Sequence, residues 1–290
     1  MTATTAFYDL FTDIQHFRQH VPGVSADLEA NELNSSAIAA RKQIRNIITP
    51  ALWNILKNEQ ESEAKDALTT AFGNFIMSKN VVFDAVAKRV SGGADIYKHE
   101  QETMRREYLD NYFNAMDTLL EILSTDETYS DTWKDTTYAK LIGELEITDT
   151  AELHSYYGID MSFLFFFRTM SIQRELLLDG LADLFTEAKT DDQLIRKLKL
   201  ALAQLIIAMA LTRFDIIELP ATIRSLFDEQ KASRSGRDEQ NRVLALASEL
   251  QENAMGIVAA VQLALTAGDG EDIVSETSFN RPEDKIYLLS

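Results

Sequence analysis

Apolar residues recur at helical spacing along most of this chain, and very few residues interrupt the pattern. Only 4 of its 290 residues are proline and 11 are glycine, far fewer than a turn-rich β-sandwich needs. The spacing predicts helices over residues 35–58, 62–90, 95–123, 160–188, 191–214 and 239–265, with short helical pieces near 137–145 and 220–230. Pro50 predicts a kink or break within the first of them. We therefore expect an all-α protein.

The predicted helices fall into two sets whose apolar positions match. Five residues of the first set align with five of the second at a constant offset: Leu68, Ala71, Phe72, Phe75 and Ile76 against Leu198, Ala201, Leu202, Leu205 and Ile206. The sequence Asn-Ala-Met also occurs twice, at 114–116 and 253–255. Helical periodicity alone produces some chance matches, but the shared order favours a duplication. We predict two tandem helical-bundle repeats.

This interpretation divides the chain into four regions. Residues 1–125 form the N-terminal repeat, and residues 126–150 form an acidic, Thr-rich connection with a short helix. Residues 151–267 form the C-terminal repeat. Residues 268–290 form an extended tail with little helical pattern.

The charge balance limits the partners. With 46 acidic and 28 basic residues, the formal net charge is −18. A surface that wraps nucleic acid needs clustered Lys and Arg, so this charge argues against such a surface and against docking on anionic membranes. DNA that passes nearby without being held is compatible with an acidic wall. Cysteine is absent, which excludes disulfides, thiolate metal sites and cysteine nucleophiles.

No targeting or membrane segment is predicted. The N-terminal stretch lacks the basic and apolar regions of a secretory signal. The longest apolar runs, residues 163–167 and 200–211, fall short of the roughly 20 residues that a membrane helix needs. We expect a cytoplasmic or particle-borne protein.

Two histidines give the one pattern that suggests a metal site. His16 and His20 share a helix face, but no third ligand is placed by the sequence. His99 and His154 lack the glutamate three residues earlier that four-helix carboxylate sites use. Nucleophile elbows, phosphate-binding loops and dinucleotide fingerprints are also absent. The sequence predicts no catalytic residue, no metal site and no cofactor, and we expect no enzyme.

The segment 161–167 (MSFLFFF) is the most unusual local feature. Five consecutive large apolar residues on a helix cover its full circumference, so they cannot all face one core. Burial between the two repeats is the first interpretation, and an oligomer contact is the second. The candidate interface residues in this segment are Met161, Phe163, Leu164, Phe165, Phe166 and Phe167.

Two further segments are candidates for contact with a partner. The sequence 231–237 (KASRSGR) is the one compact basic patch, read as a loop, and its cations are Lys231, Arg234 and Arg237. It either touches a nucleic-acid backbone or an acidic partner, or is simply solvated. The chain ends in a short apolar stretch that either docks on a neighbour or folds back on its own domain. That stretch contains Ile286, Tyr287, Leu288 and Leu289.

Residues 14–56 (IQHFRQHVPGV through ITPALWNIL) resemble the neck proteins of tailed phages and prophages, particularly those of Bacteroidetes. The shared pattern is an aromatic opening segment, a Pro-Gly turn and a helix that runs into Ile48, Pro50 and Leu52. Segments 214–226 and 279–289 also look similar to these proteins.

The resemblance implies a helical head–tail connector that carries no catalysis. Such proteins assemble as rings beneath the portal, and packaged DNA passes through the lumen. On this reading the chain forms homo-oligomers, contacts portal and tail proteins, and moves from the host cytoplasm to the virion neck. The alternative is a host helical module that binds one partner or acts as a scaffold.

Overall fold

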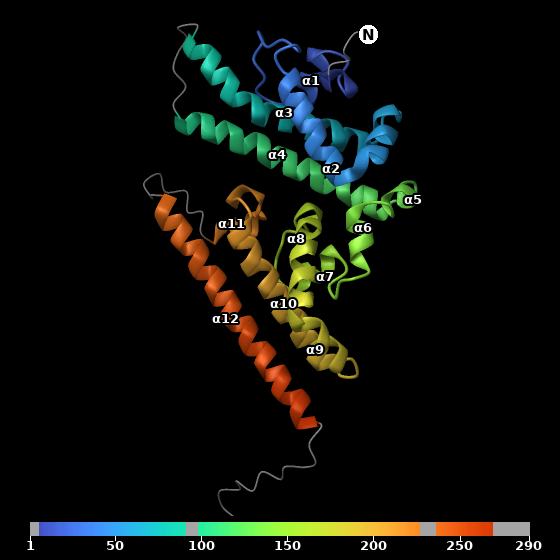
Figure 1. The fold of residues 1–290 in the computed structure, drawn as a ribbon. Coiled ribbons are helices and arrows are strands. Elements are labelled where there is room, and N and C mark those ends of the chain that lie inside the picture. Colours follow the sequence, from blue (N-terminus) through green and yellow to red (C-terminus); the bar gives the residue numbers. More distant parts are fainter. Residues whose placement is uncertain (1–5, 91–97, 227–235, 269–290) are drawn as a thin grey trace, which may run out of the picture.

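The computed structural model is all-α, as the sequence predicts, and contains no strand in the residues that it describes: 6–90, 98–226 and 236–268. Figure 1 shows an elongated molecule in which an upper group of helices stacks on a lower group. The upper group consists of η1 (Ala6–Asp9), α1 (Ile14–His20), α2 (Asn34–Asn58), α3 (Glu63–Val90) and α4 (Lys98–Thr125). The lower group contains α7 (Thr150–Tyr156), α8 (Phe163–Leu176), η2 (Leu177–Leu181), α9 (Ala182–Glu187), α10 (Asp192–Arg213), η3 (Ile216–Glu218), α11 (Ala221–Ser225) and α12 (Gly236–Gly268).

An aromatic cluster fixes the N-terminal segment to α3. The rings of Phe7, Phe11 and Phe17 lie about 5 Å apart, and Phe11 stacks on Phe72 of α3 at 5.9 Å. Burial of such large rings contributes strongly to the core. Gly73 permits the close approach, because a Cβ there would lie 2.5 Å from the side chain of Val21.

The predicted break in the 35–58 helix is present. Thr49 leaves the helical conformation with φ 72° and ψ 155°, directly before Pro50. A residue that precedes proline is disfavoured in the α region, and the proline ring removes one helical hydrogen bond. The two parts of α2 nevertheless share one buried face, which includes Ile44, Ile48 and Leu52.

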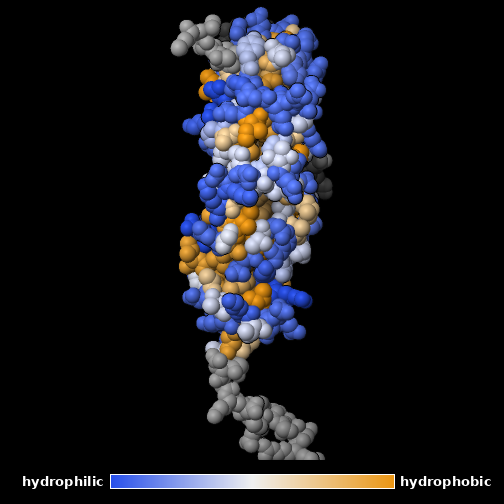
Figure 2. Space-filling model, turned by 90° about the vertical axis from the view of Figure 1, so that its right-hand side faces the viewer, coloured by the Kyte–Doolittle hydropathy of each residue, from blue (hydrophilic) through white to orange (hydrophobic). Residues whose placement is uncertain are grey.

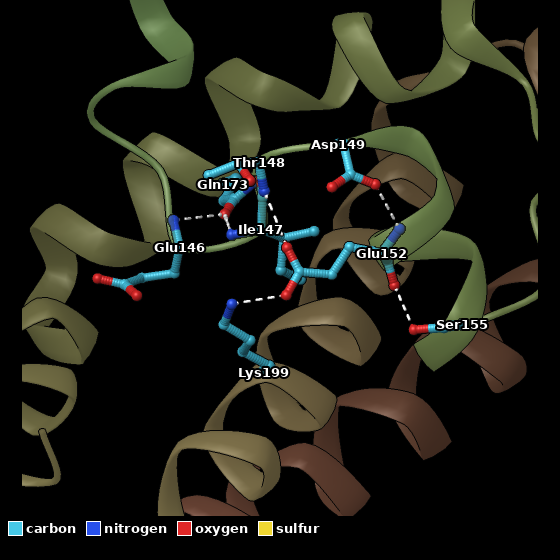
Figure 3. A network of polar contacts seen from close by, with 8 residues as sticks. All are labelled: Glu146, Ile147, Thr148, Asp149, Glu152, Ser155, Gln173 and Lys199. Atoms are coloured by element: carbon cyan, nitrogen blue, oxygen red, sulfur yellow. Dashed lines mark hydrogen bonds and ion pairs between the residues drawn. The ribbon is translucent and has the colours of Figure 1, made fainter. Parts of the chain in front are cut away.

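The connection between the two groups is anchored by a buried glutamine. This connection contains two short helices, α5 (Ser130–Trp133) and α6 (Thr137–Ile142). The side-chain oxygen of Gln173, on α8, accepts hydrogen bonds from the backbone N–H groups of Glu146 (3.1 Å) and Ile147 (2.8 Å). Its amide nitrogen donates to the Ile147 carbonyl at 3.0 Å. Figure 3 shows this network beside a second one, in which Lys199 of α10 pairs with Glu152 at 2.6 Å.

The predicted helix over residues 160–188 is interrupted, which corrects the sequence-based expectation. It begins at Phe163, passes through a π turn at Leu177–Leu181 and continues as α9. Gly180 has φ 112°, a conformation that residues with a side chain rarely adopt. The break turns the chain so that Leu178 points into solvent.

The last helix begins earlier than expected. The sequence predicts a loop over 231–237, whereas α12 starts at Gly236, so Arg237 belongs to a helix. Lys231 and Arg234 lie outside the described residues. Figure 1 shows α12 running along one side of the lower group beside α10.

Candidate docking surface

The segment 161–167 lies mainly inside the molecule, between the upper and lower groups. Leu164, Phe165, Phe166 and Phe167 are each less than 5% exposed. They contact several elements around the helix, which solves the geometric problem that five consecutive apolar residues pose. Phe167 packs against Trp133 and Tyr138, at 5.3 and 5.2 Å between ring centroids, and Phe165 packs against Phe214 at 6.1 Å.

The burial of these four residues leaves little of the segment accessible to a partner. Phe163 is partly buried, and Met161 is 42% exposed. As candidates for an interface, Leu164 to Phe167 would have to leave an existing core. The burial of these four side chains agrees with the first interpretation, in which the segment lies between the two halves of the molecule.

A carboxylate of the upper group holds the start of α8. Asp117 of α4 accepts hydrogen bonds from the backbone N–H of Leu164 at 2.7 Å and from the Ser162 hydroxyl at 3.0 Å. Burial raises the pKa of Asp117 to about 6, although these two hydrogen bonds act in the opposite direction. Because burial outweighs these hydrogen bonds, the folded chain favours the protonated form of Asp117 relative to the unfolded chain, and the link between the two groups is strongest at low pH.

The clearest unpartnered surface is one face of α12. Its buried face, which includes Ala247, Leu250, Ala254, Val258 and Val261, follows helical spacing and packs chiefly against α10. On its remaining surface three large apolar side chains are exposed: Leu244 at 51%, Met255 at 53% and Leu263 at 72%. No charged residue occurs from 253 to 268, in a chain whose net charge is −18. This half of α12 therefore offers an uncharged, largely apolar surface.

A groove lies beside this face, between α8, η2, α10 and α12. It has a volume of about 720 Å³ and is lined mostly by apolar side chains, among them Leu176, Leu178, Met209 and Leu244. Leu178 is 77% exposed, the most exposed large apolar residue among those that the structure describes. Exposed apolar side chains such as Leu178 are typical of a contact surface. Figure 2 presents the right-hand side of Figure 1, away from α12, where hydrophobic patches lie among hydrophilic residues.

The charged residues at this groove are acidic. Glu175 and Asp179 line it, and Glu175 is held by both terminal nitrogens of Arg213, at 2.6 and 2.8 Å. The hydrogen bonds from Arg213 lower the pKa of Glu175, so this carboxylate stays charged. A segment that combines apolar side chains with a nearby cation would complement the groove.

The two histidines form a hydrogen-bonded pair. Their Nε2 atoms lie 3.3 Å apart, His20 Nδ1 lies 3.2 Å from the Thr70 hydroxyl, and the Thr12 N–H donates to His16 Nδ1 at 3.3 Å. Every ring nitrogen thus has a partner, and burial and the nearby His16 lower the pKa of His20. Within the described ranges, no group of three or more His, Asp or Glu residues is placed to hold a metal ion. Nor do those ranges contain a helix long and apolar enough to cross a membrane.

The exposed face of α12 is not among the surfaces that the sequence pattern predicts. The signal that indicates it is the absence of charge from 253 to 268, which leaves no polar side to the end of an amphipathic helix. The apolar terminal residues Ile286, Tyr287, Leu288 and Leu289, and the basic side chains of Lys231, Arg234 and Arg237, lie outside the described part of the chain. Their roles stay predictions.

No protein-family model, no curated protein and no solved structure matches this chain.

Proposed function

We propose that this chain is a non-enzymatic assembly subunit of the neck of a tailed phage or prophage. In this role it forms or joins a ring between the portal and the tail and acts through protein–protein contacts. The observation that carries the proposal is the exposed, uncharged face of α12 with the apolar groove beside it. The resemblance of residues 14–56 to neck proteins supports the choice of assembly.

The charge distribution supports this proposal physically. Copies of a chain with a net charge of −18 repel one another unless they meet through an uncharged surface. Residues 253–268 supply such a surface. Head-to-tail contacts that close on themselves would produce a ring, and its other, acidic surfaces would let DNA pass without binding it.

The test is native mass spectrometry of the purified chain, alone and with the portal protein of the phage or prophage that carries its gene. The proposal predicts ring-sized oligomers or a complex with the portal. A Met255→Glu substitution places a charge in the uncharged face and should abolish assembly. Ile38→Glu is the matched control, because Ile38 is 50% exposed but lies on α2, in the upper group.

Two outcomes contradict the proposal. One is a chain that stays monomeric with and without the portal. The other is an assembly that Met255→Glu leaves intact, because the face that carries the proposal would then have no part in it. Capture of a single host protein instead of the portal would favour the alternative of a host interaction module.

A further inference from the structure

A second, smaller cleft lies between the upper and lower groups. It has a volume of about 290 Å³. One side is formed by α2, α3 and α4, and the other by α6, α8 and η3. Its wall contains three cations, Lys79, Arg105 and Arg168, two carboxylates, Asp215 and Glu218, and a set of aromatic and aliphatic side chains.

Two of the three cations have no carboxylate partner among the described residues. Arg168 is neutralised by Glu218, at 3.0 Å, and lies over the ring of Phe214. Lys79 lies 5.0 Å from the ring centroid of Phe75, and neither it nor Arg105 forms an ion pair there. Acidic residues outnumber basic ones by 46 to 28, so two unpaired cations at one cleft are unexpected. Three cations against two carboxylates leave the lining of the cleft with a net positive charge, which attracts anions more than the acidic surface elsewhere does.

A buried phenol adds a donor to the same cleft. Tyr112 is only 2% exposed, and its ring packs against Phe75 and Phe113, at 4.7 and 5.2 Å between centroids. Its hydroxyl forms no hydrogen bond with the described residues, and Tyr112 lines the cleft, so the hydroxyl is available to a ligand there. Burial raises the pKa of Tyr112, so the phenol keeps its proton and remains a donor.

We propose that this cleft binds a small organic anion, in which a carboxylate or phosphate is attached to a flat apolar group. Lys79 and Arg105 contact the charge, the Tyr112 hydroxyl donates a hydrogen bond to it, and the apolar group packs against the ring of Phe113 and the side chain of Leu164. The volume limits the ligand to roughly ten non-hydrogen atoms, from the space that water-sized groups occupy. This inference does not depend on the role in a phage neck.

Binding at this position would join the two helical groups. Lys79, Arg105 and Tyr112 belong to the upper group, whereas Leu164 belongs to the lower one. A ligand that contacts both binds only the stacked arrangement, so it raises the free energy of unfolding. The melting temperature of the full chain should therefore rise with the concentration of a binding anion.

Isothermal titration calorimetry of the full chain tests the site with four probes. Benzoate and phenyl phosphate carry both the charge and the flat group, and they distinguish a carboxylate site from a phosphate site. Inorganic phosphate lacks the ring and should bind about tenfold more weakly, because the apolar contact is lost. Benzylamine has the ring with the opposite charge and should not bind.

Three substitutions test the assigned contacts. Lys79→Gln and Arg105→Gln should each weaken binding of the better probe about tenfold, the effect of losing one charge-assisted hydrogen bond. Tyr112→Phe keeps the ring packing and should weaken binding about fivefold. Arg106→Gln is the matched control, since Arg106 is the neighbouring exposed cation on α4 and does not line the cleft; it should leave the affinity unchanged.

Several results would overturn the proposal. The site does not exist as described if neither benzoate nor phenyl phosphate binds at millimolar concentration. Equal weakening by Arg105→Gln and Arg106→Gln would mean that the anion is attracted to α4 in general. Binding of benzylamine as tight as that of benzoate would assign the affinity to the apolar wall alone. Circular dichroism of each variant, matched to the unmodified chain, excludes loss of the fold as the cause.

Discussion

The α3–α4 pair and the α10–α12 pair carry matching apolar residues but have different surroundings. The aligned residues of α3 and α10 are buried in both pairs, from Leu68 and Leu198 at one end to Ile76 and Ile206 at the other. The partner helices differ. In the upper pair, α4 also contacts α8, whereas in the lower pair α12 packs chiefly against α10.

One aligned position shows the difference directly. Met116 of α4 is fully buried, whereas Met255, which follows the same Asn-Ala dipeptide on α12, is 53% exposed. The upper pair is enclosed by η1, α1 and α2 on one side and by α8 on the other. In the lower pair, an apolar residue at a position that is buried in the upper pair has no described element packed over it. That missing cover is what we assign to another subunit or to the portal.

Substitution of the two aligned methionines gives the largest expected contrast. Met116→Ala should lower the free energy of unfolding by about 2–5 kcal/mol, because it leaves a cavity in a closed core. Met255→Ala should change it by no more than about 0.5 kcal/mol in the isolated chain. Urea denaturation of both variants measures the difference. Equal losses would mean that α12 is as well covered as α4, and the comparison would fail.

Gln173 tests whether the lower group depends on its connection to the upper one. Gln173→Met keeps the volume but removes the acceptor for two backbone N–H groups, so we expect a loss of about 3 kcal/mol in the free energy of unfolding. Gln193→Met, at an exposed position on α10, is the control and should be near neutral. A neutral Gln173→Met would show that this connection does not need its buried hydrogen bonds.

Asp117 gives the contact between the groups a pH dependence. Its pKa is raised from 3.8 to about 6 in the folded state, so the folded chain binds this proton more tightly than the unfolded chain does. The contribution of Asp117 to stability therefore falls as the pH rises from about 4 to about 6, by up to about 3 kcal/mol. Asp117→Asn removes this contribution.

The measurement is the difference in unfolding free energy between the unmodified chain and Asp117→Asn across that pH range. The difference should shift in favour of the variant as the pH rises and should be constant above about pH 7. A difference that is independent of pH would show that Asp117 has an ordinary pKa and is not buried against α8.

Gly73 and the aligned Ala203 give the smallest contrast. Gly73→Ala should cost about 1–3 kcal/mol in unfolding free energy, because the new Cβ would overlap the side chains of Val21 and Phe11. Ala203→Gly should cost about 1 kcal/mol, the ordinary penalty for glycine within a helix. Thermal denaturation of both variants would show whether the N-terminal aromatic cluster packs on α3 as tightly as described. A neutral Gly73→Ala would contradict that close approach.

Much of the helix pattern could be predicted from the sequence. The long helices have strong apolar periodicity and few internal breakers, and Pro50 marks a local break. The turn at 177–181 was missed because its one sequence signal is Gly180, and a single glycine within a helical pattern is usually tolerated. The start of α12 was missed because a basic, serine-containing segment resembles a loop.

The candidate surface was harder to predict than the helices. Periodicity identifies residues that suit a core, but it does not state whether another element covers them. The segment 161–167 is too apolar for one face of a helix to bury, and helices on several sides of α8 cover most of it. Conversely, Met255 and Leu263 fit an ordinary helix pattern and are exposed because no described element packs over them. The duplication stays a prediction, supported by shared burial in α3 and α10.

The most direct test of the proposed assembly surface uses the absence of cysteine from the natural chain. A single Met255→Cys substitution places one thiol on the exposed face of α12, and Ile38→Cys places one on α2 as a control. We predict that a thiol reagent labels both positions rapidly in dilute monomer, and that assembly with the portal slows labelling at 255 at least tenfold while position 38 is unchanged. Equal labelling rates at 255 in the monomer and in the assembled complex would show that this face is not where the chain meets its partners.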